Sequence, residues 1–185
     1  DNIHVTNKIY NMNTKYRTLG FDKIYVINLK RRNDRREKLT KSNPNIDFTF
    51  IEAVDGQDLT TEQLIEEGKL HTSFYDPSGM CTINIFACAL SHKKAWDQAL
   101  ADGVENALIL EDDFLFLDSF KENIEYLLNC SYDWELVRLI SKPKLKRKLQ
   151  KPVAELGINN QLVRLGSAPG GAYAYLISKT GAEKL

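Results

Sequence analysis

The chain has little cysteine, no long apolar run and no excess of charge of either sign. Its three cysteines are an odd number with no Cys-x-x-Cys spacing, which argues against a structural zinc site and against a disulfide scaffold. No apolar stretch reaches the length that is needed to cross a bilayer. The 25 basic and 25 acidic residues cancel, which argues against a dedicated nucleic-acid-binding protein. What remains is a globular chain of 185 residues, long enough for a substantial core.

The N-terminal segment differs from the rest of the chain. Residues 1–20 are polar and rich in asparagine, so we expect a loosely attached arm followed by a single domain over residues 21–185. The segment lacks the basic and then apolar pattern of a signal peptide, although a leader removed earlier stays open as an alternative. The odd cysteine count favours a reducing compartment. We therefore expect a cytoplasmic protein, with a membrane-peripheral location as a variant of that expectation.

Strand and helix patterns alternate along the chain. Apolar strands are expected at residues 24–27, 48–54, 107–110, 135–140, 162–165 and 172–177. Helices are expected at residues 33–42, 61–67, 83–102 and 119–129, and from residue 179 onward. Asn33 or Asp34 is the expected cap of the first helix, Thr60 and Gln63 match a capping box, and Ser178 is the expected cap of the last helix. The alternation predicts a three-layer α/β fold.

Three acids, Glu111, Asp112 and Asp113, directly follow the aliphatic run at residues 107–110. Such a run is typical of a strand buried on both faces, and ligands of open α/β sheets lie beyond the carboxyl ends of these strands. Because side chains alternate along a strand, Glu111 and Asp113 are expected on one face and Asp112 on the other. A divalent cation that also holds phosphate would relieve the repulsion among the carboxylates. A capping or turn cluster is the alternative, and the preceding aliphatic run favours the metal and nucleotide site.

Basic residues gather in two blocks, at residues 30–36 and 142–151. The first block surrounds the expected start of a helix, where the helix dipole is already positive. A bound phosphate would reverse this unfavourable effect, although the block taken alone is better explained as a solvated helix face. The second block is expected to be a solvated connection, with a cover over a phosphate-bearing ligand as the alternative.

Three further features have both a structural and a functional interpretation. His92 and Trp96 are one helical turn apart and share a face, where a core histidine packed beside an indole is the favoured interpretation. Nothing in the sequence supplies the rest of a Ser-His-Asp triad, so a hydrolase has little support. Cys88 is expected to be a helix-face hydrophobe. Gly170 and Gly171 allow a close backbone approach to a ligand or simply a bulge.

Five blocks, in this order, resemble glycosyltransferase family 25, which includes lipopolysaccharide and collagen galactosyltransferases. The blocks are residues 25–36 (YVINLKRRNDRR), 53–56 (AVDG), 88–96 (CALSHKKAW), 107–113 (ALILEDD) and 171–185 (GAYAYLISKTGAEKL). The resemblance implies a GT-A type α/β/α sandwich with a mostly parallel central sheet, a UDP-sugar donor and a divalent cation, Mn²⁺ or Mg²⁺. It covers most of the chain, which stops inside a helix that relatives continue beyond.

The resemblance also implies roles for the residues at matching positions. Those expected to line the donor are Asn28, Leu29, Arg32, Arg35, Val54, Asp55, Ser91, Gly170 and Gly171. Glu111 and Asp113 take the positions of the Asp-x-Asp metal ligands, with Asp113 as the main ligand and Glu111 as a departure from the commoner aspartate. Asp112 and His92 are the candidates for the catalytic base, which alternatively lies beyond Leu185.

The resemblance implies an inverting transfer of galactose, or of glucose, from the UDP-sugar to a hydroxyl of a glycan or of hydroxylysine. A non-catalytic module that binds the nucleotide sugar or the acceptor is the alternative. A metal-dependent phosphotransferase or hydrolase is a third, without a supporting nucleophile motif. A collagen-type acceptor would place the protein in the lumen of the endoplasmic reticulum.

Overall fold

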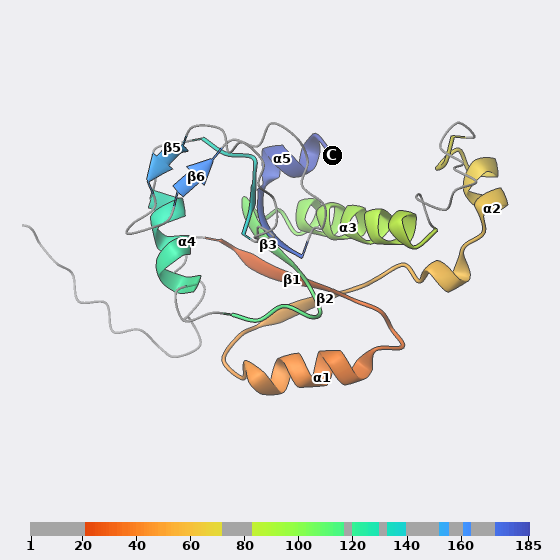
Figure 1. Cartoon of the computed structure of the whole chain (residues 1–185), viewed down its shortest axis with the longest axis horizontal. Coiled ribbons are helices and arrows are strands. Elements are labelled where there is room, and N and C mark those ends of the chain that lie inside the picture. The colour runs from red at the N-terminus through yellow and green to blue at the C-terminus, as the bar shows by residue number, and fades with distance from the viewer. Residues whose placement is uncertain are drawn as a thin grey trace, which may run out of the picture.

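The computed structural model describes residues 21–71, 83–116, 120–129, 133–139, 152–155, 161–163 and 173–185 (Figure 1). The expected N-terminal arm, the second basic block and the glycine pair lie outside these residues. The helices are α1 (Asn33–Ser42), α2 (Thr61–Glu66), α3 (Ile83–Ala101), α4 (Phe120–Asn129) and α5 (Lys179–Glu183), with a 3₁₀ turn, η3 (Gly56–Asp58). The strands are β1 (Lys23–Asn28), β2 (Phe48–Glu52), β3 (Asn106–Glu111), β4 (Leu136–Arg138), β5 (Pro152–Glu155), β6 (Gln161–Val163) and β7 (Ala174–Ser178).

Five of these strands form one sheet, in the order β2-β1-β3-β7-β4. Strand β1 pairs in parallel with both β2 and β3, whereas β7 runs antiparallel to β3 and β4. The predicted parallel sheet is therefore confirmed for its core, and the antiparallel strands complete one side. Strands β5 and β6 pair separately. Strand β5 is missing from the sequence-based expectations because four residues that include a proline carry little strand signal.

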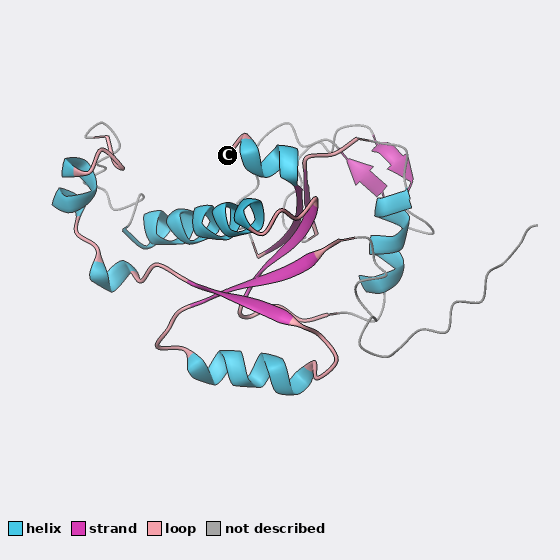
Figure 2. Cartoon of the chain, turned by 180° about the vertical axis from the view of Figure 1, so that it is seen from behind, coloured by secondary structure: helices cyan, strands magenta, loops and turns pink. Residues whose placement is uncertain are grey.

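Helices cover both faces of the sheet (Figure 2). One buried cluster joins α1 and α4 to the sheet through Val26, Leu39, Leu108, Ile124 and Leu176. A second cluster joins α3 and α5 to the opposite face through Tyr25, Ala95, Ile109, Tyr175 and Ala182. Successive strand residues enter opposite clusters because side chains alternate along a strand, so both faces must be apolar. The predicted three-layer α/β/α arrangement is confirmed.

Two helix caps follow from local sequence signals. The Thr60 hydroxyl accepts a hydrogen bond from the backbone N–H of Gln63 at 3.2 Å, and the Gln63 side chain accepts one from the N–H of Thr60 at 3.3 Å. This reciprocal pair confirms the predicted capping box of α2. Ser178 caps α5 by accepting from the N–H of Gly181 at 3.1 Å, as predicted.

The predicted cap of α1 is wrong. Arg32, rather than Asn33 or Asp34, is the N-cap residue, and its side chain makes no capping hydrogen bond. The Asp34 carboxylate is held by the Arg32 guanidinium, with Nε and Nη2 at 2.9 and 2.8 Å from its two oxygens. The ion pair therefore occupies the carboxylate that the prediction assigned to capping.

Strand β2 ends at Glu52, two residues earlier than expected. The N–H of Ala53 still donates to the carbonyl of Asn28 at 3.0 Å, but the N–H of Val54 donates to the Ser91 hydroxyl at 2.8 Å. This side-chain acceptor on α3 replaces a strand partner. The chain therefore leaves the sheet at the edge where the candidate site lies.

Asp102, directly after α3, joins this helix to the start of β1. Its Oδ2 accepts hydrogen bonds from Lys23 Nζ at 2.6 Å and from the hydroxyl of Tyr25 at 2.7 Å. Tyr25 is fully buried, so the carboxylate satisfies a hydroxyl that would be costly to leave without a partner. The hydrogen bonds from Lys23 and Tyr25 lower the pKa of Asp102 to about 2.

We expect Asp102→Asn to destabilise the fold at neutral pH and to do so less in acid. The folded-state pKa of about 2 lies below the ordinary value of 3.8, so the ionised carboxylate stabilises the fold above about pH 4 and loses this effect as the pH falls towards 2. Urea unfolding at about pH 7 and about pH 2.5 measures the difference in the free energy of unfolding between wild type and variant. We expect this difference to be smaller in acid. Asp97→Asn is the control, because Asp97 forms an exposed pair with Lys93 on the same helix. Its free energy of unfolding should be close to that of wild type at either pH. If the difference in the free energy of unfolding for Asp102→Asn grows in acid, the ionised Asp102 carboxylate does not stabilise the fold.

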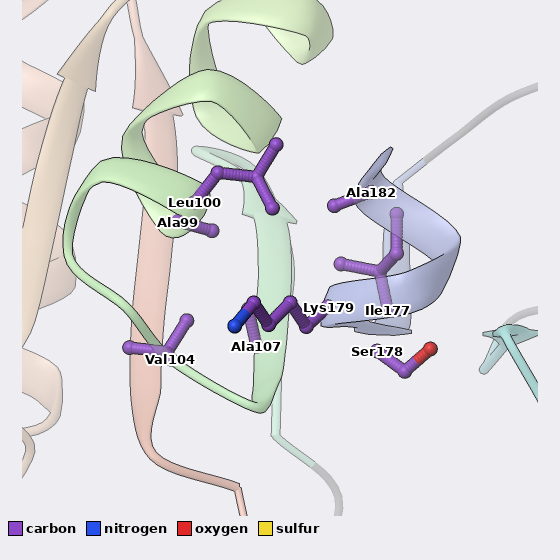
Figure 3. Close-up of a pocket in the computed structure, with 8 residues that line it drawn as sticks. All are labelled: Ala99, Leu100, Val104, Ala107, Ile177, Ser178, Lys179 and Ala182. Atoms are coloured by element: carbon purple, nitrogen blue, oxygen red, sulfur yellow. The ribbon is translucent and has the colours of Figure 1, made fainter. Parts of the chain in front are cut away.

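A shallow pocket lies at the opposite edge of the sheet from the carboxyl ends of β1 and β3 (Figure 3). Aliphatic side chains line most of it, among them Leu100, Val104 and Ile177. It is too shallow to enclose a ligand, so it carries no candidate site. Among the helices that the structure describes, none combines the length and the apolar character that crossing a bilayer requires.

Candidate functional site

The carboxyl ends of β1, β2 and β3 meet at one edge of the sheet. The strand register pairs Asn28 with Glu52 and Ile27 with Glu111, so the three strands end side by side. Ligands of open α/β sheets lie beyond this edge. The arginine-rich loop after β1, the residues after β2 and the acids after β3 therefore converge there, although they are far apart in the sequence.

Asp112 holds the β1–α1 loop to the end of β3. Asn28 Nδ2 donates to Asp112 Oδ2 at 2.8 Å, and Arg35 Nη1 donates to Asp112 Oδ1 at 2.6 Å. The same Asn28 amide donates to the carbonyl of Arg32 at 3.1 Å. Both carboxylate oxygens of Asp112 are thus engaged, and its side chain is only 10% exposed. These contacts give Asp112 a positioning role, and its assignment as the catalytic base stays a prediction.

The expected shared face of Glu111 and Asp113 is wrong. Glu111 lies on the α3 side, with Oε1 at 3.5 Å from Nε2 of His92, whereas Asp113 Oδ2 lies 3.8 Å from Nη1 of Arg35 on α1. Strand β3 ends at Glu111 and the next two residues form a turn. Side chains alternate between the two faces only while the backbone is extended. Because the extended strand ends at Glu111, the alternation that the prediction assumed does not reach Asp113.

On the α3 side, His92 is part of a buried polar network. His92 Nδ1 lies 2.9 Å from the Tyr175 hydroxyl, which also accepts a hydrogen bond from Trp96 Nε1 at 2.7 Å. The predicted shared face of His92 and Trp96 is confirmed, and Tyr175 is the residue that connects them. Tyr175 could not be predicted as this partner from the sequence, because it lies on a strand that is distant along the chain.

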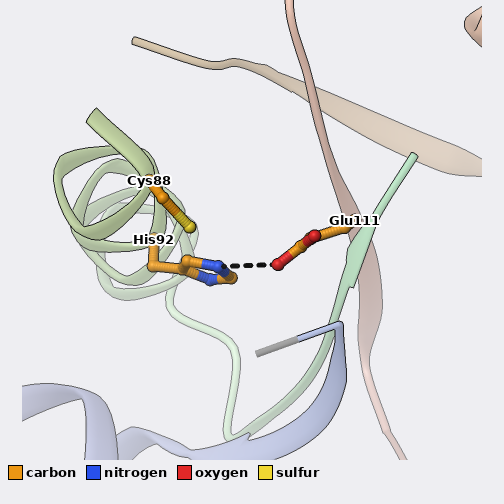
Figure 4. A group of neighbouring side chains, drawn as sticks. All are labelled: Cys88, His92 and Glu111. Carbon is orange, nitrogen blue, oxygen red and sulfur yellow. Dashed lines mark ion pairs between the residues drawn. The ribbon is translucent and has the colours of Figure 1, made fainter. Parts of the chain in front are cut away.

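Cys88 was expected to be a helix-face hydrophobe, and this prediction is wrong. Its thiol is free and the residue is exposed, one helical turn before His92. Cys88, His92 and Glu111 form a group whose potential ligand atoms all lie within 4.8 Å of one another (Figure 4). The Cys-x-x-x-His spacing on one helix face was the available sequence signal, but it does not reveal which strand residue completes the group.

The surroundings of His92 shift its pKa in opposite directions. Burial lowers the pKa, but the nearby Cys88 thiol and Glu111 carboxylate favour the protonated ring and raise the pKa to about 9. Burial also raises the pKa of Tyr175, so its hydroxyl keeps its proton at physiological pH. The network therefore presents a neutral phenol to one nitrogen of the imidazole and a carboxylate to the other.

The segment after β2 is tied down from two sides. Ser91 accepts from the N–H of Val54 and donates to the carbonyl of Ala87 at 2.6 Å, so its hydroxyl is used in fixing the segment. Asp55 accepts from Arg31 Nε at 2.5 Å, and this hydrogen bond lowers the pKa of Asp55. The structure therefore brings Val54, Asp55 and Ser91 together beside the β1–α1 loop, and adds Arg31, which sequence analysis did not assign to the site.

Each of the three arginines nearest this edge has a carboxylate partner. Arg31 pairs with Asp55, Arg32 with Asp34 and Arg35 with Asp112. The arginine side chains remain 51%, 35% and 37% exposed, in that order. A phosphate group arriving at the edge would compete with these carboxylates rather than meet free cations.

The donor chemistry of the edge fits a hard cation such as Mn²⁺ or Mg²⁺. Such ions take carboxylate oxygens, and Mg²⁺ often uses only one or two carboxylates together with phosphate oxygens of the substrate. Asp113 meets this need, because its side chain is 54% exposed and only loosely paired with Arg35. Glu111 is directed toward His92 instead. The joint assignment of Glu111 and Asp113 as metal ligands therefore stays a prediction.

Comparison with known proteins gives these observations a family context. Human procollagen galactosyltransferase 2 (Homo sapiens) is 32% identical over 176 residues, which are 90% of this chain and 28% of that protein. A glycosyltransferase 25 family member of Drosophila melanogaster is 34% identical over 174 residues, with the same coverage. A rat protein (Rattus norvegicus), named probable inactive glycosyltransferase 25 family member 3, is 32% identical over 179 residues, 90% of this chain and 30% of that protein.

The chain thus spans under a third of the length of the curated relatives that it matches. The sequence model of the family described as Glycosyltransferase family 25 (LPS biosynthesis protein) matches residues 21–185. This range includes every described element of the fold and all the residues that converge at the carboxyl edge of the sheet. The chain belongs to glycosyltransferase family 25.

Proposed function

We propose that this chain carries the donor-binding part of an inverting galactosyltransferase that uses a UDP-sugar and a collagen-type acceptor. The observation that carries the proposal is the convergence of three distant segments at one sheet edge, through the Asn28–Asp112, Arg35–Asp112 and Arg31–Asp55 contacts. The galactose and the collagen acceptor come from the names of the relatives, which include procollagen galactosyltransferases. Glucose as the sugar and a lipopolysaccharide-type glycan as the acceptor are the alternatives.

The donor is proposed to bind with its diphosphate over the start of α1 and its nucleoside beside the segment after β2. The N-terminus of a helix favours anions, and Arg guanidinium groups match phosphate geometry. Arg32 and Arg35 would exchange part of their pairing with Asp34 and Asp112 for phosphate oxygens. Val54, Asp55 and the end of β1 at Asn28 and Leu29 would form the side of the nucleoside site, and Gly170 and Gly171 are proposed to lie near the sugar.

Asp113 is the proposed main metal ligand, with Glu111 as the second ligand. When bound, Mn²⁺ or Mg²⁺ would neutralise charge on the leaving diphosphate. Inversion also requires a base that takes the proton of the acceptor hydroxyl, and Asp112 and His92 stay the two candidates within this chain. Asp112 already accepts two hydrogen bonds and His92 is buried, so a base supplied by residues outside this chain remains the third choice.

A non-catalytic binding module is the second proposed function. The rat relative named as inactive matches the chain as extensively as the relatives named as galactosyltransferases. The two proposals differ in turnover rather than in fold.

Sugar transfer from radiolabelled UDP-galactose to a hydroxylysine-containing collagen peptide separates these proposals. With Mn²⁺ we expect transfer of galactose, and with a chelator we expect none. UDP-glucose under the same conditions identifies the sugar. Binding of UDP in calorimetry without transfer to any acceptor supports the binding module, whereas a folded chain that neither binds UDP nor transfers sugar overturns both proposals.

We expect Arg32→Ala to weaken binding of UDP by about tenfold and to leave binding of uridine almost unchanged. Hydrogen bonds to charged groups contribute about 1.5–3 kcal/mol, and competition from Asp34 reduces that value toward the 1.4 kcal/mol that corresponds to a tenfold change. Arg36→Ala is the matched control, because Arg36 lies on the same helix but stacks on the ring of Phe50, with its guanidinium carbon 4.2 Å from the ring centre. Calorimetry that shows equal losses for UDP and uridine in Arg32→Ala contradicts the diphosphate assignment.

The proposed compartment is the lumen of the secretory pathway, because procollagen is the acceptor named in the relatives. The cytoplasmic location expected from the cysteine count has no support among them.

A further inference from the structure

The group formed by Cys88, His92 and Glu111 has the arrangement of three ligands around one point. Cys88 and His92 are four residues apart on α3, so both side chains leave the same face of the helix. Glu111 reaches the group from the end of β3, and Figure 4 shows the three side chains directed toward one another. The sulfur, nitrogen and oxygen atoms all lie within 4.8 Å of one another.

Nε2 of His92 is a buried polar atom that lacks a hydrogen-bond partner among the described residues. The residue is only 5% exposed, and leaving such an atom unsatisfied normally costs free energy. Oε1 of Glu111 lies 3.5 Å from Nε2, beyond the usual range of an N–H···O hydrogen bond. In a tetrahedral zinc site with bonds of about 2.0 Å, a nitrogen ligand and an oxygen ligand lie about 3.3 Å apart. The separation between Nε2 of His92 and Oε1 of Glu111 is close to this value.

The other nitrogen of His92 is already held as it is in metal sites. Nδ1 lies 2.9 Å from the Tyr175 hydroxyl, whose position is fixed in turn by Trp96. A partner on the second ring nitrogen orients a ligating imidazole and sets its tautomer. The network therefore points Nε2 toward Cys88 and Glu111 without the help of a bound ion.

We propose that Cys88, His92 and Glu111 bind a divalent cation of the zinc class, with the fourth coordination position left open. Thiolate, imidazole and carboxylate ligands suit Zn²⁺ or Co²⁺, whereas Mn²⁺ and Mg²⁺ prefer oxygen ligands alone. Three protein ligands and an open position are typical of catalytic rather than structural zinc sites. This site shares Glu111 with the proposed Mn²⁺ site, whose main ligand is Asp113. An ion bound here uses Glu111 in the direction it already has and leaves Asp113 as the Mn²⁺ ligand within this chain.

Titration of the purified, reduced chain with Co²⁺ in the absence of nucleotide tests the site. We expect a thiolate-to-cobalt charge-transfer band in the near ultraviolet that saturates at one ion per chain and is displaced by Zn²⁺. Cys88→Ser should abolish the band, and Glu111→Gln should weaken Co²⁺ affinity by at least about tenfold. Cys130→Ser is the matched control and should leave the band intact. Asp113→Ala should also leave it intact, because Asp113 is not a ligand of this site.

The absence of a band, or a band that survives in Cys88→Ser, overturns the proposal, as does equal loss in Cys130→Ser or in Asp113→Ala. Because Cys88 is exposed, its replacement should not disturb the fold, and circular dichroism of each variant verifies this. A rise in the melting temperature of wild type with Zn²⁺, absent in Cys88→Ser, is the second expected readout. Neither measurement involves UDP or sugar transfer, so a failure of the proposed function leaves this test valid, and the reverse also holds.

Discussion

Replacing Asp113 with alanine is expected to remove manganese-dependent UDP binding and to reduce sugar transfer by about 10²–10³-fold. A metal ion typically contributes several kcal/mol of charge stabilisation in such a reaction, and each 1.36 kcal/mol changes the rate by about tenfold. The fold should be unaffected, because the Asp113 side chain is 54% exposed and its contact with Arg35 is long, at 3.8 Å. The change also relieves repulsion with the neighbouring carboxylates.

Calorimetric titration with UDP, with and without Mn²⁺, measures the binding part of this prediction. Asp97→Ala is the matched control, since it removes an aspartate of similar exposure, 59%, that also has one ion-pair partner. We expect Asp97→Ala to bind UDP as wild type does. If Asp113→Ala is folded and keeps its UDP affinity in Mn²⁺, then Asp113 is not a metal ligand, and the proposed donor site must be redrawn around other residues.

Replacing Gly181 with alanine is expected to lower the free energy of unfolding by about 2–3 kcal/mol, as overpacking of a buried position does. A Cβ atom at this position would lie 2.3 Å from the carbonyl oxygen of Glu135 and 3.2 Å from Cγ1 of Ile177. The carbonyl belongs to the backbone beside β4 and accepts the N–H of Ser178 at 2.9 Å. It cannot rotate away, so either α5 or the strand must move and the hydrogen bond must lengthen.

Gly56→Ala is the matched control for this prediction. Its Cβ would also lie 2.3 Å from another atom, but that atom is Oδ1 of Asn84, the end of an exposed side chain that can change rotamer. We expect urea unfolding to show a change of under about 1 kcal/mol for Gly56→Ala. Equal losses in the two variants would show that the backbone contact of Gly181 is not the cause of its effect.

Local sequence signals determined much of the fold. The aliphatic runs predict β1 and β3 because strands buried on both faces need continuous apolar residues, and both are central in the sheet. The capping box at Thr60 and Gln63 and the cap at Ser178 are confirmed because a cap depends on residues only three positions apart. The acids after residue 110 predicted which edge of the sheet would carry polar groups.

The partners of those polar groups were decided only by the tertiary structure. Arg35 reaches Asp112 across 77 residues, and His92 reaches Tyr175 across 83 residues. Glu111, at the end of the strand that follows α3, also lies beside His92. A sequence pattern states which way a side chain leaves its own strand or helix, but it does not state which distant element lies opposite. The antiparallel direction of β7 likewise depends on long-range pairing. The amino-acid sequence by itself therefore determined the helices and strands and the polar edge of the sheet. Packing of α1 and α3 on opposite faces of the sheet separated Asp113 from Glu111. The same packing brought Cys88 and His92 close to Glu111.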